Sequence, residues 1–63
     1  MQQIKDIKDL RIGDMIVEKN HRESTPMEVV AIFSDGDIYC DFDGNEGDVW
    51  EFDINKDRIF KVE

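Results

Sequence analysis

Carboxylates are concentrated in one stretch of the chain, from residue 35 to residue 53. This stretch holds eight of the sixteen acidic residues and contains no lysine or arginine. Carboxylates without basic neighbours can hold a hard cation such as calcium, or they can attract a basic surface of another molecule. The eight residues are Asp35, Asp37, Asp41, Asp43, Glu46, Asp48, Glu51 and Asp53.

A calcium site is the first chemistry to consider. From Asp41 onward, oxygen-bearing residues occur at alternate positions, as they do in an EF-hand loop. The sixth position is Glu46, where that loop needs glycine, and the twelfth is Phe52, where it needs a bidentate glutamate. The flanking residues also alternate as strands do, whereas an EF-hand loop lies between helices. We therefore expect no metal ion and no other cofactor.

The acidic stretch alternates between apolar and other residues with a period of two, which is typical of half-buried strands. Residues 35–37 and 43–47 are rich in glycine, asparagine and aspartate and predict turns. One face of the predicted strands carries Ile38, Cys40, Phe42, Trp50 and Phe52, and the other carries Tyr39, Asp41, Asp43, Val49, Glu51 and Asp53. We interpret the stretch as the central meander of a small β-barrel whose outer face is acidic.

Two strands are expected before this meander. The first is residues 14–18, after a turn at Gly13, and a polar loop follows it from residue 19 to Pro26. The second is residues 27–34, which carry apolar residues on both faces. That pattern indicates either full burial or a bulge that swaps the faces midway, and a small barrel favours the bulge.

The two ends of the chain complete the predicted fold. Residues 53–58 suit a single 3-10 turn with Ile54 tucked inward, and residues 59–63 form the last strand. Residues 1–9 are a lead-in to the barrel of residues 10–63, and their isoleucine spacing fits either a short helical turn or an extended segment. The predicted class is all-β, a five-stranded barrel in one domain.

The order of these elements resembles an SH3-like barrel. It is also similar to small SH3-like proteins of Bacteroidetes and their phages, which begin with L-R-I-G-D/N, continue with a P-x-x-V-x-x-I strand and a tryptophan strand, and close on an isoleucine-bounded segment. The matching residues are 10–14, 26–32, Trp50 and 54–59. Most of them are core and turn positions, so the resemblance implies a fold and assigns no functional site.

Bulk properties exclude several classes of function. The formal net charge is −8, which argues against direct binding of nucleic acid and of anionic membranes, since both require lysine and arginine. The chain has no apolar run long enough to span a bilayer. Its one cysteine, Cys40, permits no internal disulfide and is expected to be a buried small hydrophobe, so we expect a cytoplasmic protein.

Enzyme activity has little support. His21 is the single histidine, and it falls in a polar loop without an obvious partner. Cys40 has no activating base nearby in the pattern. An aromatic cage for a methylated cation would need Phe33, Tyr39 and Trp50 on one rim.

The sequence thus predicts a non-enzymatic module whose acidic meander docks onto a basic protein surface. Carboxylates two residues apart on a strand repeat every 7 Å or so, close to the phosphate spacing along a nucleic-acid strand. A phage-encoded inhibitor of a host nucleic-acid-binding or defence protein is a concrete version. The expected binding residues are the eight carboxylates and Tyr39. The alternatives are an acidic face that only keeps the protein soluble, and a structural or accessory barrel that binds a small ligand as a homo-oligomer.

Overall fold

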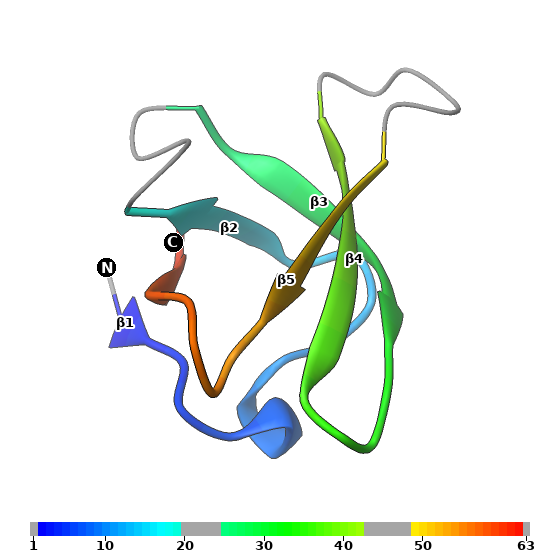
Figure 1. Cartoon of the computed structure of the whole chain (residues 1–63). Helices are drawn as coiled ribbons and strands as arrows, with labels where there is room; N and C mark the ends of the chain where they lie inside the picture. The colour runs from blue at the N-terminus through cyan, green and yellow to red at the C-terminus, as the bar shows by residue number, and fades with distance from the viewer. Residues whose placement is uncertain (1, 20–24, 43–48, 63) are drawn as a thin grey trace.

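A computed structural model of the chain describes residues 2–19, 25–42 and 49–62. These residues form one antiparallel sheet of six strands with the order β1-β6-β2-β3-β4-β5 (Figure 1). The elements are β1 (Gln2–Gln3), a 3-10 helix η1 (Ile7–Asp9), β2 (Met15–Glu18), β3 (Met27–Ile32), β4 (Asp37–Phe42), β5 (Val49–Asp53) and β6 (Ile59–Lys61). Within this described part, no helix is long and apolar enough to cross a membrane. The prediction of an all-β chain is confirmed.

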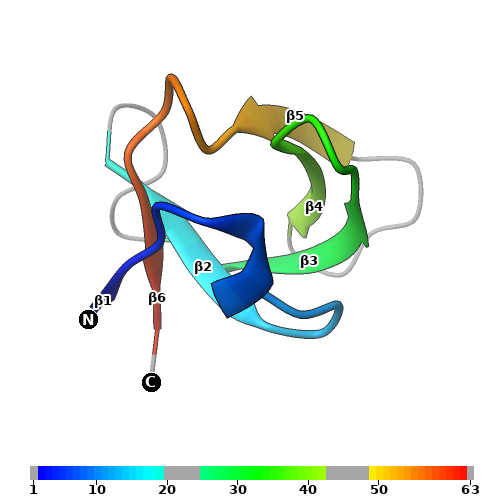
Figure 2. The same cartoon turned by 90° about the horizontal axis from the view of Figure 1, so that it is seen from below.

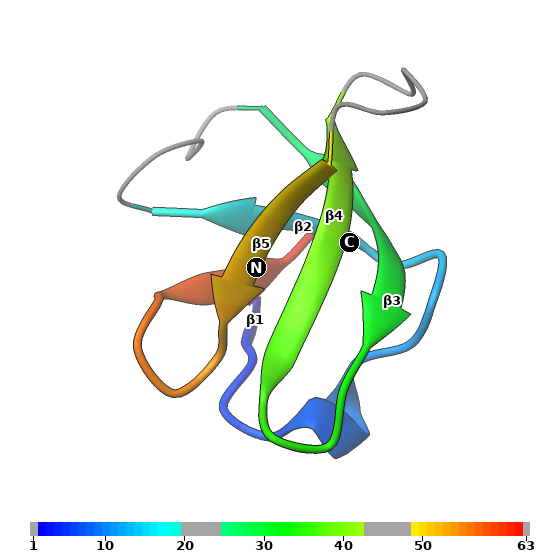
Figure 3. The same ribbon diagram turned by 45° about the vertical axis from the view of Figure 1, so that its right-hand side comes forward.

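The sheet is strongly curved. Figure 2 looks along the inside of the curve and shows β2 and β6 on one side, with β3, β4 and β5 following the sheet round to the other. In Figure 3 the three strands β3, β4 and β5 form a meander that crosses the β2–β6 pair. The hydrophobic core lies between these two parts of the sheet.

In β4 and β5, the residues predicted to face the core do face it. Ile38 and Cys40 are fully buried, Phe52 is 4% exposed, and Phe42 and Trp50 pack against the same core. The residues between them face outward. Burying each large apolar side chain contributes about 1.5–3 kcal/mol relative to leaving it in water, which is why the alternation sets the orientation of the strands.

A bulge in β3 explains its apolar residues on both faces, as the sequence predicts. Val29 pairs with Cys40, but the next partner pair is Ala31 with Tyr39, so the register shifts by one residue. Before the shift Val29 is buried, and after it Ile32 packs against the core. The strand ends at Ile32, two residues before the predicted end.

The N-terminal segment contains both of the predicted conformations. Gln2 and Gln3 are extended and pair with β6. Asp6 then caps η1 by accepting a 3.0 Å hydrogen bond from the Lys8 N–H. Between and after these elements, Ile4 and Leu10 are only 1% and 4% exposed and belong to the core. The prediction of five strands therefore omits β1.

The turn before the last strand contains the hydrogen bond of a single 3-10 turn and a second, wider one. The Asp53 carbonyl accepts hydrogen bonds from Lys56 N, three residues on, at 3.0 Å, and from Asp57 N, four residues on, at 2.7 Å. The Asp53 N–H donates to the Asp57 carboxylate at 2.9 Å. The segment is a hydrogen-bonded turn and does not extend into a 3-10 helix. Ile54 is half-buried against the core, as predicted.

Candidate functional site

The outward side chains of β3, β4 and β5 and of the residue after β3 form one continuous surface, which we call the meander face. Its geometry follows from the strand register, because cross-strand partners lie on the same side of a sheet. Glu28 pairs with Asp41, and Tyr39 pairs with Glu51. The meander face consists of Glu28, Val30, Ala31, Phe33, Asp37, Tyr39, Asp41, Val49, Glu51 and Asp53.

Like charges meet at one end of the meander face. Asp37 and Asp53 are directly paired across β4 and β5, an arrangement that destabilises a sheet. Desolvation raises the pKa of Asp37, and the charges of Asp35 and Asp53 raise it further, while Lys56 acts in the opposite direction. The face therefore holds negative charge at a cost to folding, which is a common property of functional sites.

Two of the predicted carboxylates also organise the turns beside the face. The Asp35 carboxylate accepts a 3.1 Å hydrogen bond from the Asp37 N–H. The Asp53 carboxylate accepts a 2.9 Å bond from the Asn55 N–H, and the Asn55 amide donates to the Asp35 carbonyl at 3.2 Å. Asp35 thus lies in the β3–β4 turn at one end of the sheet, whereas Glu51 lies at the middle of the face and Asp41 lies toward its other end.

The meander face also carries exposed apolar side chains. Val30, Phe33, Tyr39 and Val49 are between 36% and 47% exposed. The Phe33 and Tyr39 rings meet edge to face, with centroids 5.1 Å apart. Of these four side chains, the sequence prediction included only Tyr39 among the binding residues. Val30 follows buried Val29 and faces outward by alternation, and the bulge then brings Ile32 inward and Phe33 outward.

Glu28 is a further acidic residue that the prediction omitted. It is exposed on β3 and lies opposite Asp41. Its neighbours Met27 and Val29 are both fully buried, so a period of two already directs Glu28 outward. What the sequence lacks is the pairing of β3 with β4 in the register that brings Glu28 and Asp41 together.

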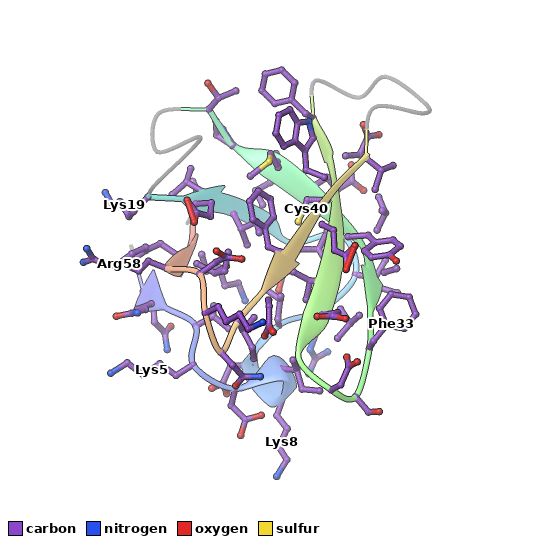
Figure 4. All side chains as sticks on the ribbon, viewed as in Figure 1. Lys5, Lys8, Lys19, Phe33, Cys40 and Arg58 are labelled. Atoms are coloured by element: carbon purple, nitrogen blue, oxygen red, sulfur yellow. The ribbon has the colours of Figure 1, made fainter. Side chains whose placement is uncertain are left out.

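The aromatic cage is not assembled. Phe33 and Tyr39 point outward from the sheet, whereas Trp50 points inward and packs against the core. Figure 4 shows Phe33 at the outer side of β3 and β4. The three rings therefore do not share a rim, and this alternative is wrong.

Several basic side chains lie away from the meander face. In Figure 4, Lys5, Lys19 and Arg58 lie on the side of β1, β2 and β6, away from Phe33. On that side Lys61 Nζ is 3.4 Å from an Asp14 carboxylate oxygen. The pKa of Asp14 is lowered, chiefly by a 2.8 Å hydrogen bond from the Arg11 N–H and further by Lys61, against an opposing effect of desolvation.

Cys40 is buried as predicted. Its side chain has no exposed surface, and burial raises the pKa of the thiol to about 12. A thiol in that environment stays protonated at neutral pH and is inert as a nucleophile.

Among the residues that the structure describes, no group of three or more histidine, cysteine or acidic side chains is placed to hold a metal ion. Of the predicted site residues, Asp43, Glu46 and Asp48 lie outside the described residues, as does His21.

A small hollow lies at the end of the sheet near Asp35. It has a volume of about 260 Å³ and lies between the N-terminal segment, the β3–β4 turn and the β5–β6 turn. Lys5, Asp6 and Asn55 supply much of its polar lining. Small-molecule sites usually enclose about 300–1,000 Å³, so the hollow is below that range.

Comparison with known proteins gives no match: no protein-family model fits the chain, and no curated protein or solved structure is significantly similar to it.

Proposed function

We propose that this chain is a non-enzymatic protein-interaction module whose meander face docks onto a basic surface of a partner protein. The observation that supports this is the composition of the face. Five carboxylates and four exposed apolar side chains share it, and the part of it that the structure describes contains no lysine or arginine. Apolar area gives an interface its buried centre, while complementary charge steers the partner and fixes its orientation.

The proposed fold is an SH3-like barrel, formed by β6, β2, β3, β4 and β5 in that order with β1 as an extension. The strand order supports it, because the last strand of the barrel lies beside the first. The position of the polar loop between β2 and β3 supports it as well. The proposal retains the resemblance to small SH3-like proteins of Bacteroidetes and their phages, and it places the protein in the cytoplasm.

A concrete version of the proposed partner is a host nucleic-acid-binding or defence protein that a phage inhibitor would block. The carboxylates support this version because alternate residues of β5, Glu51 and Asp53, both carry one. Alternate residues of a strand are about 7 Å apart, close to the spacing of successive phosphates along one strand of nucleic acid. A surface that normally binds phosphates would then accept the meander face.

The test is capture of partners from a lysate of the source cell at low and high salt. Immobilised wild-type protein is compared with the double variant Glu28→Gln/Glu51→Gln, which neutralises two exposed carboxylates of the face. The matched control is Asp6→Asn/Asp9→Asn, which removes the same charge near η1. Asparagine at residue 6 keeps the helix cap, because it caps as well as aspartate does.

We expect a basic protein to be enriched at low salt by the wild type and by the control, and to be lost in the face variant and at high salt. Screening explains the salt effect, since the Debye length falls from about 30 Å at 0.01 M to about 8 Å at 0.15 M. Equal capture by the face variant would refute docking through this face, and so would enrichment of no basic protein at low salt.

The second candidate function is a structural or accessory domain that binds a small ligand. The hollow of about 260 Å³ beside Lys5 and Asn55 favours it, and assembly of several copies would be needed to enlarge it to the usual size. Binding in a pocket would change little with salt, so the same two salt conditions separate the two candidates.

A further inference from the structure

We propose that the free edge of β5 binds the partner, and that an extended basic segment of the partner adds to the sheet as a further strand beside Glu51. This inference rests on the proposed function, because it gives the shape of the partner at the meander face. It follows from the directions of the backbone hydrogen bonds in β4 and β5.

Antiparallel strands alternate between residue pairs that exchange hydrogen bonds and pairs whose backbone groups point away from each other. Ile54 N donates to Gly36 O at 3.0 Å, so these residues belong to a bonded position. The next pair in the register, Asp37 with Asp53, must then be of the other kind. Consistently, Asp37 O accepts from Phe33 N at 2.9 Å, on the side of β4 away from β5.

The backbone hydrogen bonds of Asp53, on β5, support this assignment. Its N–H donates to the Asp57 carboxylate, and its carbonyl accepts from Asp57 N, so both groups point away from β4 into the following turn. Glu51 lies two residues earlier in the same strand, and its N–H and C=O have the same direction. The same holds for Val49.

β5 is the last strand of the sheet, and β4 is the only described strand that pairs with it. Glu51 is exposed, and Val49 is 47% exposed. Asp53 has its backbone groups occupied by the turn, so the open positions are Glu51 and Val49. Such an edge is a template for an added strand, a common mode of peptide recognition.

Charge determines which strand fits. Side chains of directly opposite residues lie about 4.5–5.5 Å apart at their Cβ atoms, so one outward residue of an added strand would lie beside Glu51. Lysine or arginine is favoured at that position, and an apolar residue is favoured beside Val49. A second copy of this chain is disfavoured, since antiparallel pairing centred on Glu51 would place the two Glu51 carboxylates opposite each other.

The experiment uses the full chain labelled with ¹⁵N and an acetylated, amidated peptide of sequence Lys-Val-Lys-Val-Lys-Val. Amide hydrogen exchange is measured by NMR with and without the peptide. In the free protein we expect the Glu51 amide to exchange fast and the Trp50 and Phe52 amides, which face β4, to exchange slowly. A peptide concentration of ten times Kd should slow exchange at Glu51 about tenfold, because about one molecule in eleven remains free.

Val49→Pro supplies the matched variant. Proline at residue 49 removes an N–H that points away from β4, a position where edge strands tolerate it. Val49→Ala also removes the branched side chain but keeps the N–H. We expect Val49→Pro to bind the peptide about fivefold to tenfold more weakly than Val49→Ala, which corresponds to the loss of one hydrogen bond.

Slow exchange of the Glu51 amide in the free protein would overturn the proposal, because the edge would then be closed. Binding that shifts resonances of the meander face but leaves Glu51 unprotected, with equal affinity in the two Val49 variants, would also overturn it. That second result leaves docking through the face intact. If docking through the face is itself wrong, the capture experiment shows it, because Glu28→Gln/Glu51→Gln then captures as much of the partner as the wild type does.

Discussion

Gly36 is the residue at which the β3–β4 turn contacts the β5–β6 turn. Its φ of 104° lies in the region that favours glycine, and its carbonyl accepts the hydrogen bond from Ile54 N. A Cβ at residue 36 would contact the Asn55 amide nitrogen and come within 3.1 Å of an Asp53 carboxylate oxygen. The close approach of these two turns fixes where β4 and β5 begin and end, and hence the register of the face.

Gly36→Ala should therefore destabilise the fold by more than backbone strain alone. Gly13 is the matched control, because its φ is 98° and a Cβ there meets nothing within 4 Å. We expect Gly13→Ala to cost about 1–2 kcal/mol from the backbone. Gly36→Ala should cost about 1 kcal/mol more, because the Asn55 side chain must move and lose its hydrogen bond to the Asp35 carbonyl. Urea unfolding measures both losses, and equal losses would show that this side-chain hydrogen bond does not stabilise the fold.

At the scale of elements, β4 and β5 were the part of the fold that the sequence predicted best. Alternation identifies their inward residues, such as Ile38 and Phe52, because the core rejects charge and accepts apolar area. The bulge in β3 was also predictable, since Val29 and Ile32 would lie on opposite faces of a regular strand although both are apolar. β1 was not, because a strand of two glutamines has no pattern of its own and exists only through pairing with β6.

The candidate site was less predictable than the strands that carry it. A single strand pattern assigns each residue to a face but does not say which strands are neighbours. The pairs Glu28 with Asp41 and Asp37 with Asp53 depend on register, which the turns determine. The direction of the Glu51 backbone groups depends on register in the same way.

Desolvation of Asp37, together with the nearby charges of Asp35 and Asp53, predicts a pH-dependent penalty to folding. Because the pKa of Asp37 in the folded chain is above the ordinary value of 3.8, the folded state binds more protons than the unfolded state between those two values. The contribution of Asp37 to the free energy of unfolding therefore falls as pH rises through this interval, and it is unfavourable at neutral pH.

Asp37→Asn should raise the free energy of unfolding at pH 7, and the advantage should shrink as pH falls through the raised pKa toward 3.8. The gain should be smaller in an Asp53→Asn background, where one opposing charge is already gone. Thermal or urea unfolding of the four proteins in this cycle gives the answer. A difference that is constant across pH, or equal in both backgrounds, would contradict the assigned coupling.

At the scale of the whole molecule, the meander face is acidic and several basic side chains lie away from it. The described chain extends 26 × 22 × 19 Å, with the carboxylates of the meander face on one side and Lys5, Lys19 and Arg58 on another. The net charge of −8 still makes repulsion dominant overall. At 0.01 M salt the Debye length of about 30 Å exceeds the size of the molecule, whereas at 0.15 M it is about 8 Å.

Moderate salt should consequently stabilise the fold. We expect the free energy of unfolding of the wild type to rise between about 0.01 M and 0.15 M sodium chloride. The rise should be smaller in Glu28→Gln/Glu51→Gln, because the repulsion on the meander face is already reduced. Urea unfolding at the two concentrations measures it. A decrease in stability with salt would mean that attractive pairs outweigh repulsion in this chain.

The central claim is that the arrangement of the carboxylates on the meander face, and not the net charge of the chain, attracts the partner. The most direct measurement is the affinity of the captured basic protein for the wild type, for Glu28→Gln/Glu51→Gln and for Asp6→Asn/Asp9→Asn, at one low salt concentration. The two variants carry the same net charge. We predict that the face variant binds about tenfold more weakly and that the control binds as the wild type does. Equal weakening in both variants would contradict the claim.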